Sequence, residues 1–202
     1  AISSISWDDP NFPNIEGFGV WAAKCNFTMG PDGKMYSRML GGNLVRIDVE
    51  NARGENLTNG DLVGTKDGSA YGLVFDPQDE NVFYFSNNDK HCIYKYDLRT
   101  KECACWAGQE GKSGYLDGPI GQAMFNKPGQ MCVDSEGNII LTDTENHCIR
   151  KITMSTGYVS TLAGKPQNSG YVNGSAEDAQ FKKPLGICID NDDVMYIGDS
   201  EN

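Results

Sequence analysis

The sequence is poor in basic residues and in histidine, and it contains no long apolar run. Its 202 residues carry 17 Lys and Arg against 28 Asp and Glu, which gives a formal net charge of −11 at pH 7. A surface that binds nucleic acid needs clustered positive charge, so we expect no nucleic-acid partner. No segment approaches the roughly 18 apolar residues of a membrane span, and the first residues lack the layout of a signal peptide. We therefore expect no transmembrane segment.

The short motifs of common catalytic sites are also missing. There is no Gly-x-Ser-x-Gly, no His-Glu-x-x-His and no phosphate-binding loop, and His91 and His147 are too few to form a three-His zinc site. Among the seven cysteines, Cys103 and Cys105 form a Cys-x-Cys, which is shorter than the Cys-x-x-Cys of a zinc knuckle. We expect the thiols to pack as small apolar side chains, and we predict neither catalytic nor metal-ligating residues.

What the sequence does contain is a repeat. Residues 91–146 align with residues 147–202 without a gap, and 20 of the 56 positions are identical. Weaker copies precede them, around residues 73–76 and 27–29. Repetition at this period is typical of folds in which each unit covers the next one. We assign the whole chain to one such domain, with repeat units at about 13–60, 61–108, 109–164 and 165–202.

Each unit contains the pattern of four short strands. In the third unit the β-branched or apolar runs are 129–134, 139–142, 149–152 and 158–162. The gaps between them hold Ser, Gly, Asn, Asp and Thr, which favour turns, and no segment has a sustained helical period. Four-stranded antiparallel units that repeat every 46 to 58 residues predict an all-β fold, a β-propeller with about four blades in this chain.

Four runs of the third unit carry a resemblance to a known family. They are Asn126-Lys-Pro-Gly-Gln-Met-Cys-Val-Asp134, Gly137-Asn-Ile-Ile-Leu-Thr-Asp143, Asn146-His-Cys-Ile-Arg-Lys-Ile152 and Val159-Ser-Thr-Leu-Ala-Gly164. Together they resemble the NHL repeat, with its Pro-x-Gly lead, two apolar runs that end in Asp, and Asn-His before Ile-Arg-Lys-Ile. The resemblance is weakest in the first unit, where Gly30 replaces the first Asp and residues 41–43 replace the acidic turn.

The NHL resemblance implies a propeller of six blades, each of about 50 residues. We therefore expect the chain to be a segment of a longer protein, in preference to a ring closed by a strand from residues 2–7. Its long links between blades resemble those of NHL proteins of bacterial envelopes, which are often lipid-anchored. The resemblance thus implies a periplasmic or cell-surface location, with a lipid anchor in the parent protein.

The antiparallel order of the strands predicts which turns meet. The turns 134–138 and 154–157 share one end of the blade, and the turn 143–147 and the link 164–181 share the other end, which we call the top face. Long loops on a rigid scaffold are the usual place for binding residues. The candidate binding residues on this face are Asp89, His91, Tyr115, Asp117, Asp143, Glu145, His147, Tyr171, Asn173 and Asp199.

Each type of candidate also has a structural interpretation. The Asp side chains can accept backbone N–H groups of their own turn, and the His side chains can hydrogen-bond within it. The Tyr rings can hold the loops against the blade, or they can stack on a sugar. For each type of side chain the sequence favours the structural interpretation and leaves the binding one open.

The absence of a convergent catalytic set favours a non-catalytic binding or scaffolding propeller, without a cofactor, that presents its top-face loops to a protein or glycan partner. The alternative is a propeller enzyme of the lyase or lactonase type, which the NHL resemblance allows. Such an enzyme would hold Ca or Zn in the central channel, with Asp143, His147 and Asp199 as ligands. RNA-binding NHL propellers present a basic top face, which the acidic turns here do not match.

Overall fold

The computed structural model describes residues 27–38, 44–48, 53–58 and 71–202. These residues form short β-strands joined by turns, together with one single-turn 3-10 helix, η1 (Thr144–Asn146). No helix in this part of the chain has the length and apolar character needed to cross a membrane. Residues 2–7 and 41–43, which the sequence analysis mentions, lie outside the described residues, and so does Cys25, one of the seven cysteines.

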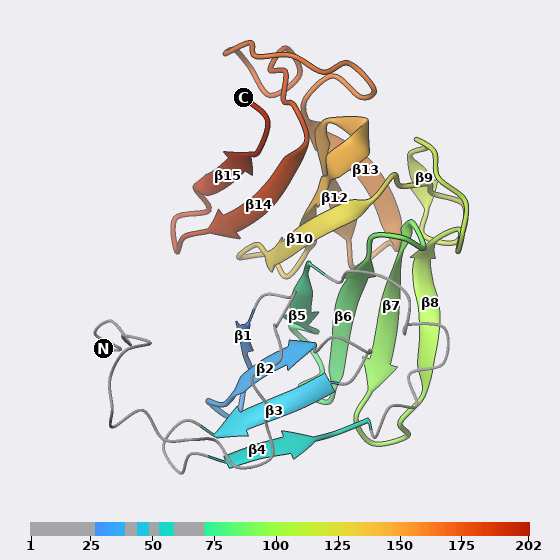
Figure 1. Ribbon diagram of the computed structural model, residues 1–202, viewed down its shortest axis with the longest axis vertical. Coiled ribbons are helices and arrows are strands. Elements are labelled where there is room, and N and C mark those ends of the chain that lie inside the picture. Colours follow the sequence, from blue (N-terminus) through green and yellow to red (C-terminus); the bar gives the residue numbers. More distant parts are fainter. Residues whose placement is uncertain (1–26, 39–43, 49–52, 59–70) are drawn as a thin grey trace.

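The strands form four antiparallel sheets that follow one another along the chain (Figure 1). Each of the first three sheets has four strands in sequential order, and the fourth has two. The third sheet gains a short outer strand, β9 (Gly118–Pro119), which pairs with its last strand. The remaining strands are β1 (Thr28–Met29), β2 (Met35–Arg38), β3 (Leu44–Asp48), β4 (Arg53–Asn56), β5 (Leu73–Phe75), β6 (Val82–Asn87), β7 (Cys92–Asp97), β8 (Cys103–Gly108), β10 (Pro128–Val133), β11 (Ile139–Asp143), β12 (Cys148–Thr153), β13 (Tyr158–Ala163), β14 (Pro184–Ile189) and β15 (Met195–Asp199).

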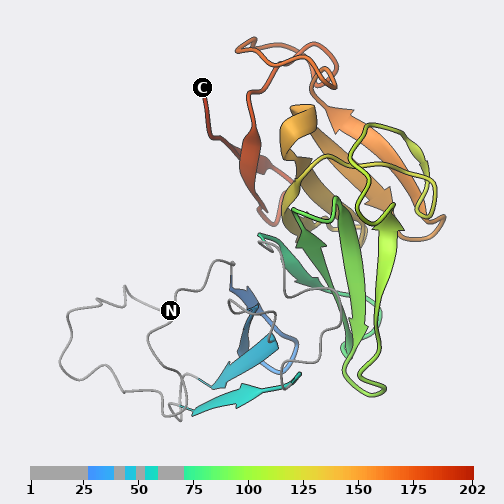
Figure 2. The same ribbon diagram turned by 45° about the vertical axis from the view of Figure 1, so that its right-hand side comes forward.

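This arrangement confirms the prediction of four-stranded antiparallel blades. The four strands predicted in the third unit agree with β10 to β13 to within one residue at each end. Adjacent blades pack through their first strands, because β10 contacts β14 of the next blade and β5 and β6 of the preceding one (Figure 2). The described residues are therefore part of a β-propeller.

Alternate side chains of each strand cover the two faces of its blade, and apolar clusters lie between the blades. In β6, Phe83 and Phe85 belong to the cluster between the first and second blades, whereas Val82 and Tyr84 belong to the cluster between the second and third. In β11, Ile140 faces the fourth blade. The second and third blades are thus held by apolar contacts on both faces, which explains why such a repeat depends on its neighbours.

A turn carboxylate recurs near the end of each first strand. In the later blades it accepts the backbone N–H two residues further along, and it belongs to Asp76, Asp134 and Asp190. The first blade has Gly30 at this position, but Asp32 accepts the Lys34 N–H at 3.1 Å and the Tyr36 hydroxyl at 3.0 Å. A side chain at Gly30 would overlap the Tyr36 ring. The first blade therefore has the same carboxylate, displaced by two residues, which the sequence alignment does not reveal.

Candidate functional site at the top face

The structure confirms which turns share an end of the blade. The backbone N–H of Met154 donates to Asn138 Oδ1 at 3.2 Å, which joins the two turns at the bottom. At the opposite end, the backbone N–H of Gln167 donates to the Asn146 carbonyl at 2.8 Å. This bond joins the link after β13 to η1, and both lie at the same end of the third blade in Figure 1.

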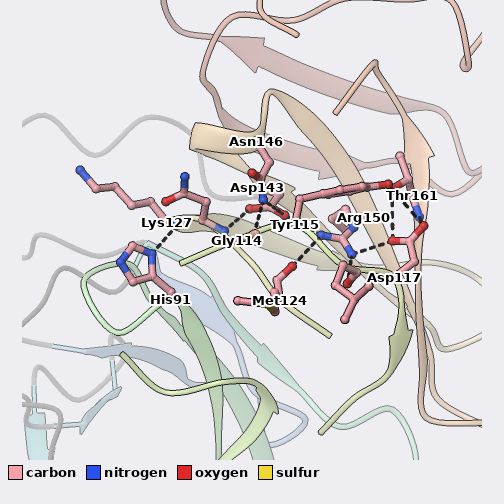
Figure 3. Close-up of polar contacts among 12 residues, drawn as sticks. His91, Gly114, Tyr115, Asp117, Met124, Lys127, Asp143, Asn146, Arg150 and Thr161 are labelled. Carbon is pink, nitrogen blue, oxygen red and sulfur yellow. Dashed lines mark hydrogen bonds and ion pairs between the residues drawn. The ribbon is translucent and has the colours of Figure 1, made fainter. Parts of the chain in front are cut away.

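Asp143 ends β11 at the top face, and its side chain is fully buried. Its Oδ1 accepts the backbone N–H of Asn126 at 2.7 Å, and its Oδ2 accepts Asn146 Nδ2 at 2.8 Å and Arg150 Nη1 at 2.7 Å (Figure 3). Burial raises the pKa of Asp143 to about 6, against the opposing effect of Arg150. Both oxygens of the carboxyl group therefore already have hydrogen-bond partners within the protein.

Arg150 is the central residue of this network, and the sequence analysis did not single it out. Its side chain is fully buried, and its Nη2 donates to Asp117 Oδ1 at 2.6 Å and to the Leu116 carbonyl at 2.9 Å. Its guanidinium lies between two rings, 4.9 Å from the centroid of Tyr115 and 5.2 Å from that of Phe125. The only signal in the sequence is one Arg at an inward position of an apolar strand.

Tyr115 and Asp117 attach the link before the third blade to its outer strand. The Tyr115 hydroxyl lies 2.7 Å from Thr161 Oγ1, and Asp117 Oδ2 accepts the backbone N–H of Thr161 at 3.1 Å. Figure 3 shows Tyr115, Asp117, Asp143 and Arg150 as one continuous set of contacts. Three of the predicted candidates are therefore brought together, by an arginine between them.

The two histidines make the same contact in successive blades. Both have a left-handed backbone, with φ of 56° at His91 and 57° at His147. His91 Nδ1 accepts the backbone N–H of Lys127 at 3.1 Å, and His147 Nδ1 accepts that of Lys183 at 3.1 Å. Each histidine therefore links the turn of one blade to the first strand of the next.

The His91 contact predicts a pH dependence of stability. Partial burial, together with Lys127, holds the pKa of His91 below its usual value. A histidine whose pKa is lowered by folding contributes stability that is complete above the unfolded pKa of about 6.5 and is lost as the pH falls below it. We expect the thermal midpoint of the chain to fall between pH 7 and pH 5, and to fall less in His91→Asn, which tolerates the left-handed backbone but does not titrate. Equal pH profiles for the two proteins would contradict this role.

Charged side chains also connect adjacent turns. Glu145 lies 4.0 Å from Lys127 Nζ and 3.7 Å from Lys183 Nζ, and Glu201 lies 2.9 Å from Lys183 Nζ. Asp89, which occupies the equivalent position in the turn of the second blade, is exposed. Because these pairs are partly exposed to solvent, they add little to stability and leave a charged rim on the top face.

The fourth blade repeats the turn geometry. Asp199 Oδ1 accepts the backbone N–H of Lys182 at 2.7 Å, and Asn202 Nδ2 donates to the Gly170 carbonyl at 2.8 Å, as Asp143 and Asn146 do in the third blade. The repetition indicates that these positions serve the turn itself.

The loop of the fourth blade differs in its exposure. Tyr171, the equivalent of Tyr115, is 75% exposed, and Asn173, the equivalent of Asp117, is also exposed. The positions 56 residues after Arg150 and Thr161, which would cover this loop, lie beyond the 202 residues of the sequence. Tyr171 is therefore the most accessible aromatic ring among the predicted candidates.

The structure does not bring the alternative metal ligands together. Within residues 27–38, 44–48, 53–58 and 71–202, no three His, Cys, Asp or Glu side chains form a group that could hold a metal ion. This applies to Asp143 and His147, which flank the same turn, and to Asp199, which belongs to the turn of the next blade. Asp143 is occupied by Arg150, and His147 Nδ1 is occupied by a backbone N–H.

The family follows from the sequence of the third blade. A model of the NHL repeat matches residues 125–152, which begin before β10 and extend into β12. This chain contains an NHL repeat. The identity agrees with curated relatives, among them NHL repeat-containing protein 2 of Homo sapiens, 29% identical over 92 residues that cover 45% of this chain and 12% of the relative.

Another relative is the Arabidopsis thaliana Protein SUPPRESSOR OF QUENCHING 1, chloroplastic. It is 28% identical over 167 residues, which cover 79% of this chain and 16% of the relative. This NHL-repeat protein thus spans a small part of the curated relatives that it matches.

Solved structures share the fold. A structural genomics protein of unknown function from Bacteroides thetaiotaomicron is 27% identical with a TM-score of 0.76, and the match covers 85% of this chain and 43% of that one. An auxiliary nutrient binding protein from the same organism is 27% identical with a TM-score of 0.67, over 85% and 44% of the two chains. Virginiamycin B lyase from Staphylococcus aureus, at 17% identity and a TM-score of 0.56 over 86% and 47%, shares the fold alone.

Proposed function

We propose that this NHL-repeat protein is part of a non-catalytic propeller that presents its top-face loops to a protein or glycan partner outside the cytoplasm. The proposal rests on one observation: the polar side chains at the centre of the top face already form hydrogen bonds within the protein. Asp143 is held by Arg150, and His91 and His147 each accept a backbone N–H. The groups that remain accessible are loop side chains, which suit binding better than chemistry.

The similarity to solved structures supports a binding function. The two proteins described as auxiliary nutrient binding proteins, from Bacteroides thetaiotaomicron and Bacteroides ovatus, are 27% and 26% identical to this chain. A nutrient-binding protein acts where nutrients arrive, so this similarity also supports the periplasm or cell surface as its location. A lipid anchor in the parent protein is part of the same proposal.

The alternative proposal is an enzyme of the lyase or lactonase type, with Ca or Zn in the central channel. A cavity of about 940 Å³, lined by the first strands of all four blades, favours a channel site. Its wall includes Met131, Ile187 and the thiol of Cys132, whose pKa is raised to about 12 by burial. The wall also includes the carboxylates of Asp76 and Glu80, but no three His, Cys, Asp or Glu side chains among the described residues form a group that could hold Ca or Zn, so the cavity gives this alternative little support.

Binding of the purified 202-residue chain to a glycan array tests the proposed function. We expect retention of saccharides, and a loss of about tenfold or more in affinity in Tyr171→Ala, because an exposed aromatic ring on a loop supplies much of the contact area. Tyr158→Ala is the matched control: Tyr158 is 47% exposed but begins β13 at the bottom of the blade.

Two results would count against the proposal. Turnover of D-glucono-1,5-lactone by the wild-type chain with added Ca²⁺ or Zn²⁺ would favour the enzyme alternative. Equal weakening of binding in Tyr171→Ala and Tyr158→Ala would place the binding surface away from the top face.

A further inference from the structure

We propose that a cavity beside Tyr115, at the outer top corner of the third blade, binds one sugar unit of a neutral saccharide. The inference rests on the proposed binding function and adds to it a ligand class and a place. The cavity measures about 360 Å³ and lies between the link before the blade, the end of β13, and the link after the blade. This volume lies within the range of roughly 300 to 1,000 Å³ that is usual for small-molecule sites.

Tyr115 forms a rigid floor for this cavity. Its hydroxyl is fixed at 2.7 Å from Thr161 Oγ1, and one face of its ring is covered by the Arg150 guanidinium at 4.9 Å. Tyr115 lines the cavity, whereas Arg150 is fully buried and does not. Because the ring is already held in place, a ligand would lose little free energy in ordering it.

The remaining walls combine apolar and polar groups. Leu162 and Pro166 supply apolar surface, whereas Asn168 and Glu177 are exposed side chains that line the cavity. An amide and a carboxylate together donate to and accept from neighbouring hydroxyl groups, and an aromatic face packs against the C–H groups of a sugar ring. The cavity therefore matches the amphipathic character of a saccharide.

The charges of the site disfavour ionic ligands. An anion would find only Lys165, which is 3.6 Å from Asp178 and thus already paired, in a chain of net charge −11. A cation would meet the Glu177 carboxylate, but it would have to stack on a ring whose other face already carries the Arg150 guanidinium, which weakens a second cation–π contact. A neutral polar ligand avoids both costs.

The preceding link provides a matched control. Residues 109–121 of that link are equivalent to residues 165–177, and they place Lys112 and Gly121 where the proposed site has Asn168 and Glu177. The two links share the same backbone hydrogen bonds, because Lys112 N–H donates to Gln109 and Asn168 N–H donates to Lys165 in the same way. A substitution at Lys112 therefore tests the same exposed loop position without touching the cavity.

Saturation-transfer NMR and calorimetry on the 202-residue chain test the inference. The probes are the methyl glycosides of glucose, galactose, mannose and N-acetylglucosamine, with choline as a cationic probe. We expect binding of at least one glycoside, weakened about tenfold in Asn168→Ala and in Glu177→Ala through loss of a ligand hydrogen bond, and unchanged in Lys112→Ala. Thermal midpoints of the variants check that all of them are folded.

Three outcomes would overturn the inference. Binding of choline alone would make the cavity a cation site. Glycoside binding that survives both Asn168→Ala and Glu177→Ala would place the saccharide elsewhere and leave the proposed function intact. Absence of glycoside binding at 10 mM, roughly the concentration at which a weak single-sugar contact is measurable, would leave a protein partner as the remaining form of the proposed function.

Discussion

Replacement of Arg150 by methionine is expected to lower the free energy of unfolding by about 3–5 kcal/mol. Methionine keeps much of the apolar stem but leaves Asp143 as a fully buried carboxylate without its charged partner. It also removes the donors to Asp117 and to the carbonyls of Leu116 and Met124, which hold the link before the third blade. Urea unfolding of the wild-type and variant chains, followed by circular dichroism, measures the difference.

A surface arginine with the same number of carboxylate partners is the control. Arg99 pairs with Asp79 at 2.6 Å and with Asp97 at 2.7 Å, but its side chain is 54% exposed. Arg99→Met should change the unfolding midpoint little, because water and salt screen such pairs. An equal shift in Arg99→Met and Arg150→Met would show that burial of the network has no special role.

A double substitution separates the contribution of the two charges from that of the packing of their side chains. In Asp143→Leu with Arg150→Met no buried charge is left unpaired, so much of the lost stability should return. The second blade supports this expectation, because the equivalent positions are occupied by Asn87 and Tyr94, which are buried and uncharged. A double variant as unstable as the sum of the single variants would indicate that the blade requires the charges themselves.

The difference between Arg150 and Tyr94, which occupy equivalent positions, also shows which features could not be predicted from the sequence. The strands, the blade pattern and the top and bottom turns follow from a repeat of 56 residues, because apolar alternation and turn residues recur at equal positions. The Arg150 network does not recur, since Asp143 is replaced by Asn87 and Arg150 by Tyr94 in the second blade. The repeat therefore predicts the strands and turns that all blades share, but not the contacts that occur in one blade alone.

The same reasoning explains the first blade. Its turn carboxylate comes from Asp32 and not from the position of Gly30, and only the packing of the Tyr36 ring makes the exchange visible. The role of the histidines was also left open by the sequence. For a single His in an acidic turn the sequence favours a structural hydrogen bond within the turn, but the actual partner is a backbone N–H of the next blade, 36 residues away.

Phe125→Ala is expected to cost about 3–5 kcal/mol of the free energy of unfolding, the usual range for a phenylalanine removed from a core. The ring is fully buried in the cluster between the second and third blades. It lies directly on the backbone at Gly108, where a Cβ would come within 2.9 Å of its Cδ2, and it covers one face of Arg150. Its loss would leave a cavity at the junction of two blades and weaken the packing of the buried ion pair. The unfolding midpoint in urea measures this cost.

Phe181 is the matched control, because it occupies the equivalent position one blade later and lies on Gly164 in the same way. Phe181 is only partly buried. The position of the fourth blade that is equivalent to Arg150 lies beyond the 202 residues of the sequence. Phe181→Ala should therefore be clearly less destabilising than Phe125→Ala, although the local backbone is the same. If both substitutions lower the free energy of unfolding equally, the contact of the ring with glycine would account for the loss. If only Phe125→Ala is severe, the stability arises from the closed junction between two complete blades, which is the property that a repeat fold gains from its neighbours.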